Sequence, residues 1–302
     1  MLELALQVNL DPQFVWNGLV IGSIFAIAAL GLTLIFGVLD FILVCYGEYL
    51  TLGAYFAWVA YVDFGIPIFV AVMIAMIGVA AISYLLDKTV FQYFRADDRD
   101  RVTLLIVSIG IAFILRNVIR IIWGTRSRAI RRTGAGVTES IEVGGVFIQP
   151  SQPIIIVASL VALAVTFLVL RRTDVGIAMR AASDDLDLVR LRGIDTERLV
   201  VYVWIIGGAI AGLSGVLLGI NAQVRPVMGF FAIILIFGAV IAGGIGSPTG
   251  AVGGGYLMGF IREMSVALGI PTNYKIAVAF VVFIGILLWR PDGLFGQSTR
   301  DT

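Results

Sequence analysis

The sequence predicts an all-α, polytopic integral membrane protein with about eight or nine transmembrane helices. Hydrophobic residues make up 60% of the 302 residues, charged residues make up only 14%, and the mean hydropathy is +1.02. These values lie far from those of a soluble globular domain. The apolar runs continue over about 20 residues, the length of a membrane-spanning helix, whereas the strands of a membrane barrel alternate over about ten. We therefore expect a single transmembrane domain over residues 1–302.

The composition excludes several kinds of chemistry from this chain. There is no histidine, and the single cysteine, Cys45, cannot form an intrachain disulfide. Ser-His-Asp and Cys-His catalytic arrangements, His-ligated metals and Cys-rich metal sites are thereby excluded. Neither Lys88 nor Lys275 follows a glycine, so there is no Walker A motif, and any ATP must be used by another polypeptide. We expect no enzyme activity, no catalytic residue, no cofactor or metal on this chain and, at a net charge of +1, no nucleic-acid partner.

Nine apolar segments are predicted to span the membrane in turn. The first runs from Phe14 to about Phe36, longer than the core of a signal peptide, and no Lys or Arg precedes it. We expect it to be a retained helix with its N-terminus outside. Twelve of the 21 Lys and Arg residues then fall in cytoplasmic segments and six in outer loops, including the polar external loop 123–153, in agreement with the positive-inside rule. The other predicted spans are 47–62, 67–86, 102–122, 154–170, 199–220, 230–245, 251–269 and 275–289.

The segment between two apolar runs that holds the most charged residues is 171–198, with six Arg and six carboxylates. Its middle is predicted to be a helix over 184–192, with Ser183 as the N-cap and Gly193 as the stop. Nine residues cannot hold a helix alone in water, so the helix must pack on this chain or on a partner protein. An ordinary solvated connection is the alternative interpretation. Its apolar side is formed by Ala182, Leu186 and Val189.

Ionisable residues within the predicted spans are few, and each charge at the bilayer centre costs at least roughly 2.5 kcal/mol. Arg262 and Glu263 are adjacent on one helix and point in different directions, so they need partners on other helices. Arg116 and Arg120 are expected to snorkel to the outer interface. Glu48 is placed at the cytoplasmic start of the second span. The candidates for a translocation path are Tyr46, Glu48, Arg262 and Glu263, and structural ion pairs are the alternative.

Two glycine-containing stretches suggest an internal duplication. The sequence Leu-Ile-Phe-Gly occurs at 34–37 and again at 235–238, and each copy is followed by a Gly-X-Tyr sequence, at 53–55 and at 254–256. The offset is constant, and duplicated halves are common in transporters. The alternative is a chance match, because Gly, Ile and Phe are frequent in this chain.

Several stretches resemble the permease subunit of branched-chain amino-acid ABC importers, specifically the smaller permease of the leucine/isoleucine/valine system and its relatives for other amino acids, amides and urea. Residues 17–37 resemble the opening helix of that family, and Gly47-Glu48 with residues 52–55 resembles its second motif. Residues 180–194 resemble the cytoplasmic signature that engages the ATPase, and residues 243–255 resemble a late Gly-rich turn. Residues 43–46 are Leu-Val-Cys-Tyr where many relatives have Asn-Phe-Ala-His, so substrate preference does not transfer.

The resemblance implies a permease that forms the translocation pathway for branched-chain or other small amino acids or amides, in the plasma (inner) membrane of a prokaryote. Its expected partners are separate ATPase subunits that use ATP and Mg, a second permease subunit of different sequence, an extracytoplasmic solute-binding protein and membrane lipid. The C-terminus is expected to be cytoplasmic. A stand-alone secondary transporter or channel for a small polar solute is the alternative. The implied ATPase contacts in the coupling loop 171–198 are Arg180, Ala182, Asp184, Asp185, Leu186, Val189, Arg190 and Gly193.

Overall fold

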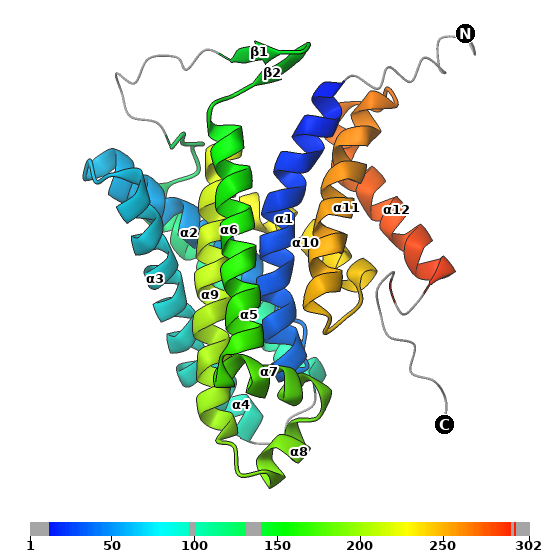
Figure 1. Cartoon of the computed structure of the whole chain (residues 1–302). Coiled ribbons are helices and arrows are strands. Elements are labelled where there is room, and N and C mark those ends of the chain that lie inside the picture. The colour runs from blue at the N-terminus through cyan, green and yellow to red at the C-terminus, as the bar shows by residue number, and fades with distance from the viewer. Residues whose placement is uncertain (1–11, 97–100, 131–139, 291–292, 294–302) are drawn as a thin grey trace. The chain divides into compact units, whose positions relative to one another are not determined.

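The computed structural model describes residues 12–96, 101–130, 140–290 and 293, and it is mainly helical, as predicted (Figure 1). The chain forms two compact units, each built from segments that are distant in the sequence. Unit 1 comprises residues 1–30, 134–160 and 234–302, and unit 2 comprises residues 31–133 and 161–233. The single permease domain expected over residues 1–302 stays a prediction.

Helices account for nearly all of the regular structure. A π-helical turn (Val59–Asp63) continues α2 (Tyr46–Trp58), another (Asp87–Phe91) joins α3 (Ile68–Leu86) to α4 (Gln92–Ala96), and a 3-10 turn (Thr272–Tyr274) precedes α12 (Lys275–Trp289). Strands β1 (Ile141–Val143) and β2 (Val146–Ile148) form an antiparallel hairpin. The α-helices are α1 (Pro12–Leu39), α2 (Tyr46–Trp58), α3 (Ile68–Leu86), α4 (Gln92–Ala96), α5 (Arg101–Trp123), α6 (Ser151–Arg172), α7 (Asp174–Asp184), α8 (Leu186–Leu191), α9 (Thr196–Asn221), α10 (Met228–Gly243), α11 (Pro248–Ala267) and α12 (Lys275–Trp289).

Six helices in the described part of the chain are long and apolar enough to cross a membrane, so the chain is polytopic as predicted. α10 is apolar but shorter. The two other predicted spans are the helices α2 and α11, which carry ionisable residues and several glycines. Nearly every residue of α2 is buried. A helix surrounded by protein does not need an apolar surface, which explains why α2 is too polar for a lipid-facing span. The six spans are α1, α3 extended through α4, α5, α6, α9 and α12 with its preceding 3-10 turn.

Glycines set the close packing of α2, α3 and α9 in unit 2. A Cβ atom added to Gly53 in α2 would lie 2.5 Å from the carbonyl oxygen of Gly212 in α9. A Cβ atom added to Gly215 in α9 would overlap the carbonyl oxygen of Leu50 in α2. Small residues of this kind let membrane helices approach until their backbones touch. The core that packs here is small as well and contains Ala57, Ala75 and Val216.

In unit 1, α11 packs against the first part of α1 and against α10 and α12. Backbone atoms of Ala26 in α1 lie where a Cβ of Gly255 would be, and the carbonyl of Ala239 in α10 lies where a Cβ of Gly254 would be. The hydroxyl groups of Ser23 and Tyr256 are 3.2 Å apart across the same contact between α1 and α11. The two Leu-Ile-Phe-Gly stretches are helical, in α1 and α10, and the proposed duplication stays a prediction.

The β1–β2 hairpin lies within the loop predicted over 123–153, of which residues 131–139 lie outside the described residues. The side-chain amide of Gln13 in α1 donates to the carbonyl of Phe147 (3.2 Å) and accepts from its backbone N–H (2.7 Å). The indole N–H of Trp16 donates to the Oε1 of Gln152 at 2.7 Å. The hairpin is therefore fixed to the start of α1 by side chains that bind its backbone and the first turn of α6.

Candidate functional site

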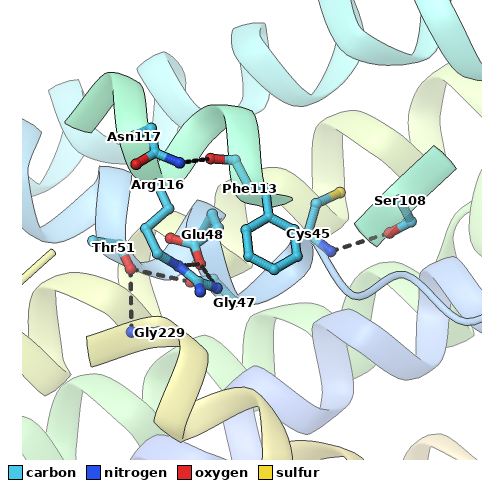
Figure 2. A network of polar contacts seen from close by, with 9 residues as sticks. All are labelled: Cys45, Gly47, Glu48, Thr51, Ser108, Phe113, Arg116, Asn117 and Gly229. Atoms are coloured by element: carbon cyan, nitrogen blue, oxygen red, sulfur yellow. Dashed lines mark hydrogen bonds and ion pairs between the residues drawn. The ribbon is translucent and has the colours of Figure 1, made fainter. Parts of the chain in front are cut away.

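Glu48, in the first turn of α2, forms a buried ion pair with Arg116 of α5 (Figure 2). Its Oε1 accepts from Nη2 of Arg116 at 2.6 Å and from Nε at 2.9 Å. The two side chains are 1% and 11% exposed, and the guanidinium lies 4.2 Å from the ring of Phe230. The prediction that Arg116 snorkels to the interface is therefore wrong, because α2 supplies a carboxylate within the fold. Arg120, one turn further along α5, is exposed.

The segment 40–45 carries the chain from the end of α1 to this buried position. Asp40 forms an ion pair with Arg101 at the start of α5, and the backbone N–H of Cys45 donates to the hydroxyl of Ser108 at 3.1 Å. Glu48 then pairs with Arg116. At 1.5 Å per helical residue, the contacts on α5 advance by roughly 22 Å from Arg101 to Arg116. Glu48 therefore lies well inside the layer of spans, which corrects its predicted position at the cytoplasmic edge.

The first turn of α10 is attached to the first turn of α2 beside this ion pair. The hydroxyl of Thr51 donates to the carbonyl of Gly47 at 3.3 Å and accepts from the backbone N–H of Gly229 at 3.1 Å (Figure 2). Among the described residues, the hydroxyl of Tyr46 and the Oε2 of Glu48 are buried without a hydrogen-bond partner. Because Tyr46 and Glu48 are 0% and 1% exposed, their packing supports the structural alternative more than a solute path.

Glu263 of α11 forms a short ion pair with a residue of another helix. This confirms the prediction that Glu263, being adjacent to Arg262 on one helix, needs a partner elsewhere. Its Oε2 accepts from Nζ of Lys275, the first residue of α12, at 2.7 Å. The distance between Arg262 Nε and Glu263 Oε1 is 3.7 Å, too long for a hydrogen bond. The guanidinium of Arg262 instead lies 5.9 Å from the ring of Phe25 in α1. The pair of Glu263 with Lys275 thus joins α11 to the start of α12.

The coupling loop 171–198 contains two helices, α7 and α8, where one was predicted. Thr173 caps α7 by accepting from the N–H of Gly176 at 3.1 Å. The predicted cap Ser183 lies inside α7, and Asp185 separates the helices in an extended conformation, its Oδ1 accepting from the N–H of Leu188 at 2.9 Å. Ser183, Asp184 and Asp185 are all of residue types that cap helices, and only Asp185 has non-helical backbone angles. Gly193 has φ +79° and follows α8, which confirms it as the stop.

The implied ATPase contacts separate into buried and exposed residues. Ala182 and Val189 are 4% exposed, so they attach the loop to this chain and are not available to a partner. Leu186 is half-buried, and the side chain of Asp184 lies outside what the structure describes. Arg180, Asp185, Arg190 and Gly193 are exposed.

Sequence reasoning missed three exposed apolar residues near the end of the loop. Leu188 is 52% exposed, Leu191 is 84% exposed and Ile194 is 41% exposed. Leu188 and Leu191 are three residues apart, so they share a helix face opposite to Val189. This second apolar face could have been recognised in the sequence as a candidate contact surface. An apolar tip on a charged loop is the arrangement expected of a surface that binds another protein.

Comparison with known proteins covers almost the whole chain. The model of the family described as "Branched-chain amino acid transport system / permease component" matches residues 14–287. The chain is 31% identical over 292 residues to the high-affinity branched-chain amino acid transport system permease protein BraD of Pseudomonas aeruginosa, covering 93% of this chain and 94% of the relative. It is 30% identical over 296 residues to LivH of Escherichia coli, described in the same words, covering 94% and 95% of the two chains.

A third relative is also similar over almost its whole length. The probable branched-chain amino acid transport permease protein LivH of Methanocaldococcus jannaschii is 28% identical over 317 residues, covering 99% of this chain and 97% of the relative. No solved structure matches the chain. A permease of this kind is a multi-pass component of an ABC transport system, which implies ATPase and binding-protein partners, and it is not an enzyme and carries no cofactor of its own. The match of residues 14–287 shows that this chain belongs to the family of branched-chain amino acid transport system permease components.

Proposed function

We propose that this chain forms the translocation pathway of an ATP-driven importer for branched-chain or other small amino acids or amides. It works with a second permease subunit of different sequence, with ATPase subunits on the cytoplasmic side and with a solute-binding protein on the outer side. The membrane is the inner membrane of a prokaryote, with the N-terminus outside and the C-terminus in the cytoplasm. The printed names of the relatives support the solute class, and the length of the match supports a shared architecture.

The chain order around α6 supports the assignment of the two sides. The β1–β2 hairpin precedes α6 and the coupling loop follows it, and α6 is apolar enough to span a membrane. The hairpin and the loop then lie on opposite sides. The loop carries six Arg residues, and the positive-inside rule favours its placement in the cytoplasm.

The observation that carries the proposal is the exposed apolar tip of the coupling loop, formed by Leu188, Leu191 and Ile194. The tip lies beyond the ends of the spans α6 and α9, so it belongs to the aqueous side of the fold. Exposed Arg190 lies between Leu188 and Leu191 in the sequence, and exposed Arg180 precedes them. An apolar centre with a charged rim is how transient protein interfaces are built, and a groove on the ATPase would cover it.

Replacement of Leu191 tests this surface directly. Leu191→Asp places a charge where the proposal expects an apolar contact, and we expect the amount of co-purified ATPase to fall at least tenfold while the permease remains folded in detergent. Leu191→Met keeps the apolar contact and is the matched control. Normal ATPase recovery with Leu191→Asp would contradict the proposed contact.

The glycine after α8 gives a second test. Any non-glycine residue at φ +79° is strained, with Asn tolerated best, and no atom lies within 4 Å of an added Cβ. Gly193→Arg therefore adds a long side chain in open space next to the tip, and Gly193→Asn controls for the backbone strain. We expect Gly193→Arg alone to lose the ATPase. Solute flux through liposomes that contain this chain alone would instead support a stand-alone transporter or channel.

A further inference from the structure

A cleft of about 440 Å³ lies in unit 2, beside the coupling loop. Its walls come from the end of α1, from the junction of α3 and α4, from α8 and from the first turns of α9. The span α1 ends at this cleft and the span α9 begins there. The cleft therefore opens at the boundary between membrane and water, on the side of the coupling loop.

The walls of the cleft combine an apolar surface with charges of both signs. The apolar side chains are Val38, Leu39, Leu186, Val200 and Val201. Two ion pairs within the lining satisfy four of the charges: Asp87 with Arg95 at 2.6 Å, and Asp195 with Arg198 at 2.9 Å.

Three further charged residues line the cleft. Arg190 donates to Thr196, and the other two, Lys88 and Glu197, have no ion-pair partner among the residues that the structure describes. Lys88 contacts only the hydroxyl and ring of Tyr84, with Nζ 3.5 Å from the oxygen. Glu197 has no ion pair in the same part of the chain and projects from the first turn of α9. Besides the guanidinium of Arg190, the cleft thus offers one ammonium and one carboxylate without an ion-pair partner beside an aliphatic wall, and a pure anion would meet the carboxylate of Glu197 while a pure cation would meet the ammonium of Lys88.

We propose that this cleft binds a small zwitterion with a branched aliphatic chain, namely the imported amino acid after its release into the cytoplasm. Its carboxylate binds Lys88, its ammonium binds Glu197, and its side chain contacts the valines of α9. This inference rests on the proposed function for the solute class and for the cytoplasmic placement of the loop. Such a zwitterion could also be the headgroup of a phosphatidylethanolamine lipid, which shares the two charges but has no branched chain at that position.

The position of α8 gives the bound ligand a consequence for transport. Leu186 and Arg190 of α8 line the cleft, and Nε of Arg190 donates to the hydroxyl of Thr196 in α9 at 3.3 Å. A ligand that fills the cleft also meets Leu186 of α8, and it therefore joins α8 to the junction of α3 and α4 and to α9. If α8 must move when the ATPases close, the occupied cleft opposes that movement and slows import as the product accumulates.

The test measures binding of radiolabelled L-leucine to the purified full complex, without ATP and without the binding protein, in nanodiscs of phosphatidylglycerol alone. We expect saturable binding that is competed by leucine and valine, and not by glycine, isovalerate or isoamylamine. Lys88→Gln and Glu197→Gln should each weaken it about tenfold, as expected for the loss of a charge-assisted contact. Val201→Trp should abolish binding by filling the cleft. Arg172→Gln, which removes an exposed charge outside the lining, is the matched control.

The outcomes separate this inference from the proposed function. Unchanged leucine binding in all three cleft variants, or equal competition by isovalerate, isoamylamine or glycine, would overturn the cleft assignment even if the complex imports leucine. Loss of leucine binding in nanodiscs that contain phosphatidylethanolamine would assign the cleft to a lipid headgroup. Uptake and ATPase recovery are measured on the same preparations, so a failure of the importer proposal is recorded independently. In proteoliposomes preloaded with leucine, Lys88→Gln should import faster than the parent.

Discussion

Removal of the guanidinium of Arg116 should destabilise the protein strongly, because it leaves the carboxylate of Glu48 buried without a partner. That carboxylate is 1% exposed and accepts two hydrogen bonds from Arg116. Breaking a buried ion pair by removing one partner costs about 3–5 kcal/mol, which lowers the ratio of folded to unfolded protein by roughly two to three and a half orders of magnitude. Arg116→Met should therefore lose about this free energy of unfolding, and the cation–π contact with Phe230 is lost as well.

The double variant decides whether the loss comes from the unpaired charge. Glu48→Met with Arg116→Met replaces the pair by apolar side chains of similar length, and such replacements are often neutral. We expect the double variant to recover most of the stability, measured by reversible unfolding in mixed micelles. Arg120→Met removes an exposed charge one turn further along α5 and should change stability by less than about 0.5 kcal/mol. A mild Arg116→Met variant, or a double variant as unstable as the sum of the two single variants, would refute the reasoning.

Three further predictions follow from the packing and the polar contacts. Gly215→Ala should reduce the yield of folded protein in fluorescence-detected size exclusion, because the new methyl overlaps the backbone of α2, whereas Gly110→Ala, with no atom within 4 Å of the new Cβ, should not. Lys275→Met should destabilise the α11–α12 contact by about 2–4 kcal/mol, and Glu263→Gln in the same chain should restore part of it, as read from thermal unfolding. Gln13→Ala should increase protease cleavage at the hairpin, because both hydrogen bonds to its backbone are lost, while the unfolding midpoint changes little.

Helix positions were predictable from the sequence because apolar length and polarity report directly on a membrane environment. The predicted spans near 102–122 and 275–289 correspond to α5 (Arg101–Trp123) and α12 (Lys275–Trp289). Hydropathy could not show that α2 begins inside the fold. A buried helix and a lipid-facing helix differ in what surrounds them, and local composition carries only part of that information.

The partners of charged residues were less predictable than the residues themselves. Glu48 and Arg116 were both recognised as groups that need an explanation, yet their pairing depends on the path of residues 40–45 along α5, which no periodicity records. The three possible caps at residues 183–185 present a similar limit, because only the backbone angles select Asp185. The exposure of Leu191 was also not predictable, because residue spacing defines the faces of a helix but does not show which face packs against the rest of the protein.

The burial of Glu48 has a consequence for biosynthesis. Its partner Arg116 follows 68 residues later in the chain. At roughly 5–20 residues per second of synthesis, the carboxylate waits about 3–14 s before the guanidinium has even been made. A helix with an unpaired carboxylate enters lipid unfavourably, so α2 is poorly suited to leave the translocon on its own. The helix α9, which packs against α2 in the folded protein, is synthesised later still. The nascent chain therefore needs a protected place for α2, at the translocon or beside an insertase, until α5 and α9 arrive to enclose it.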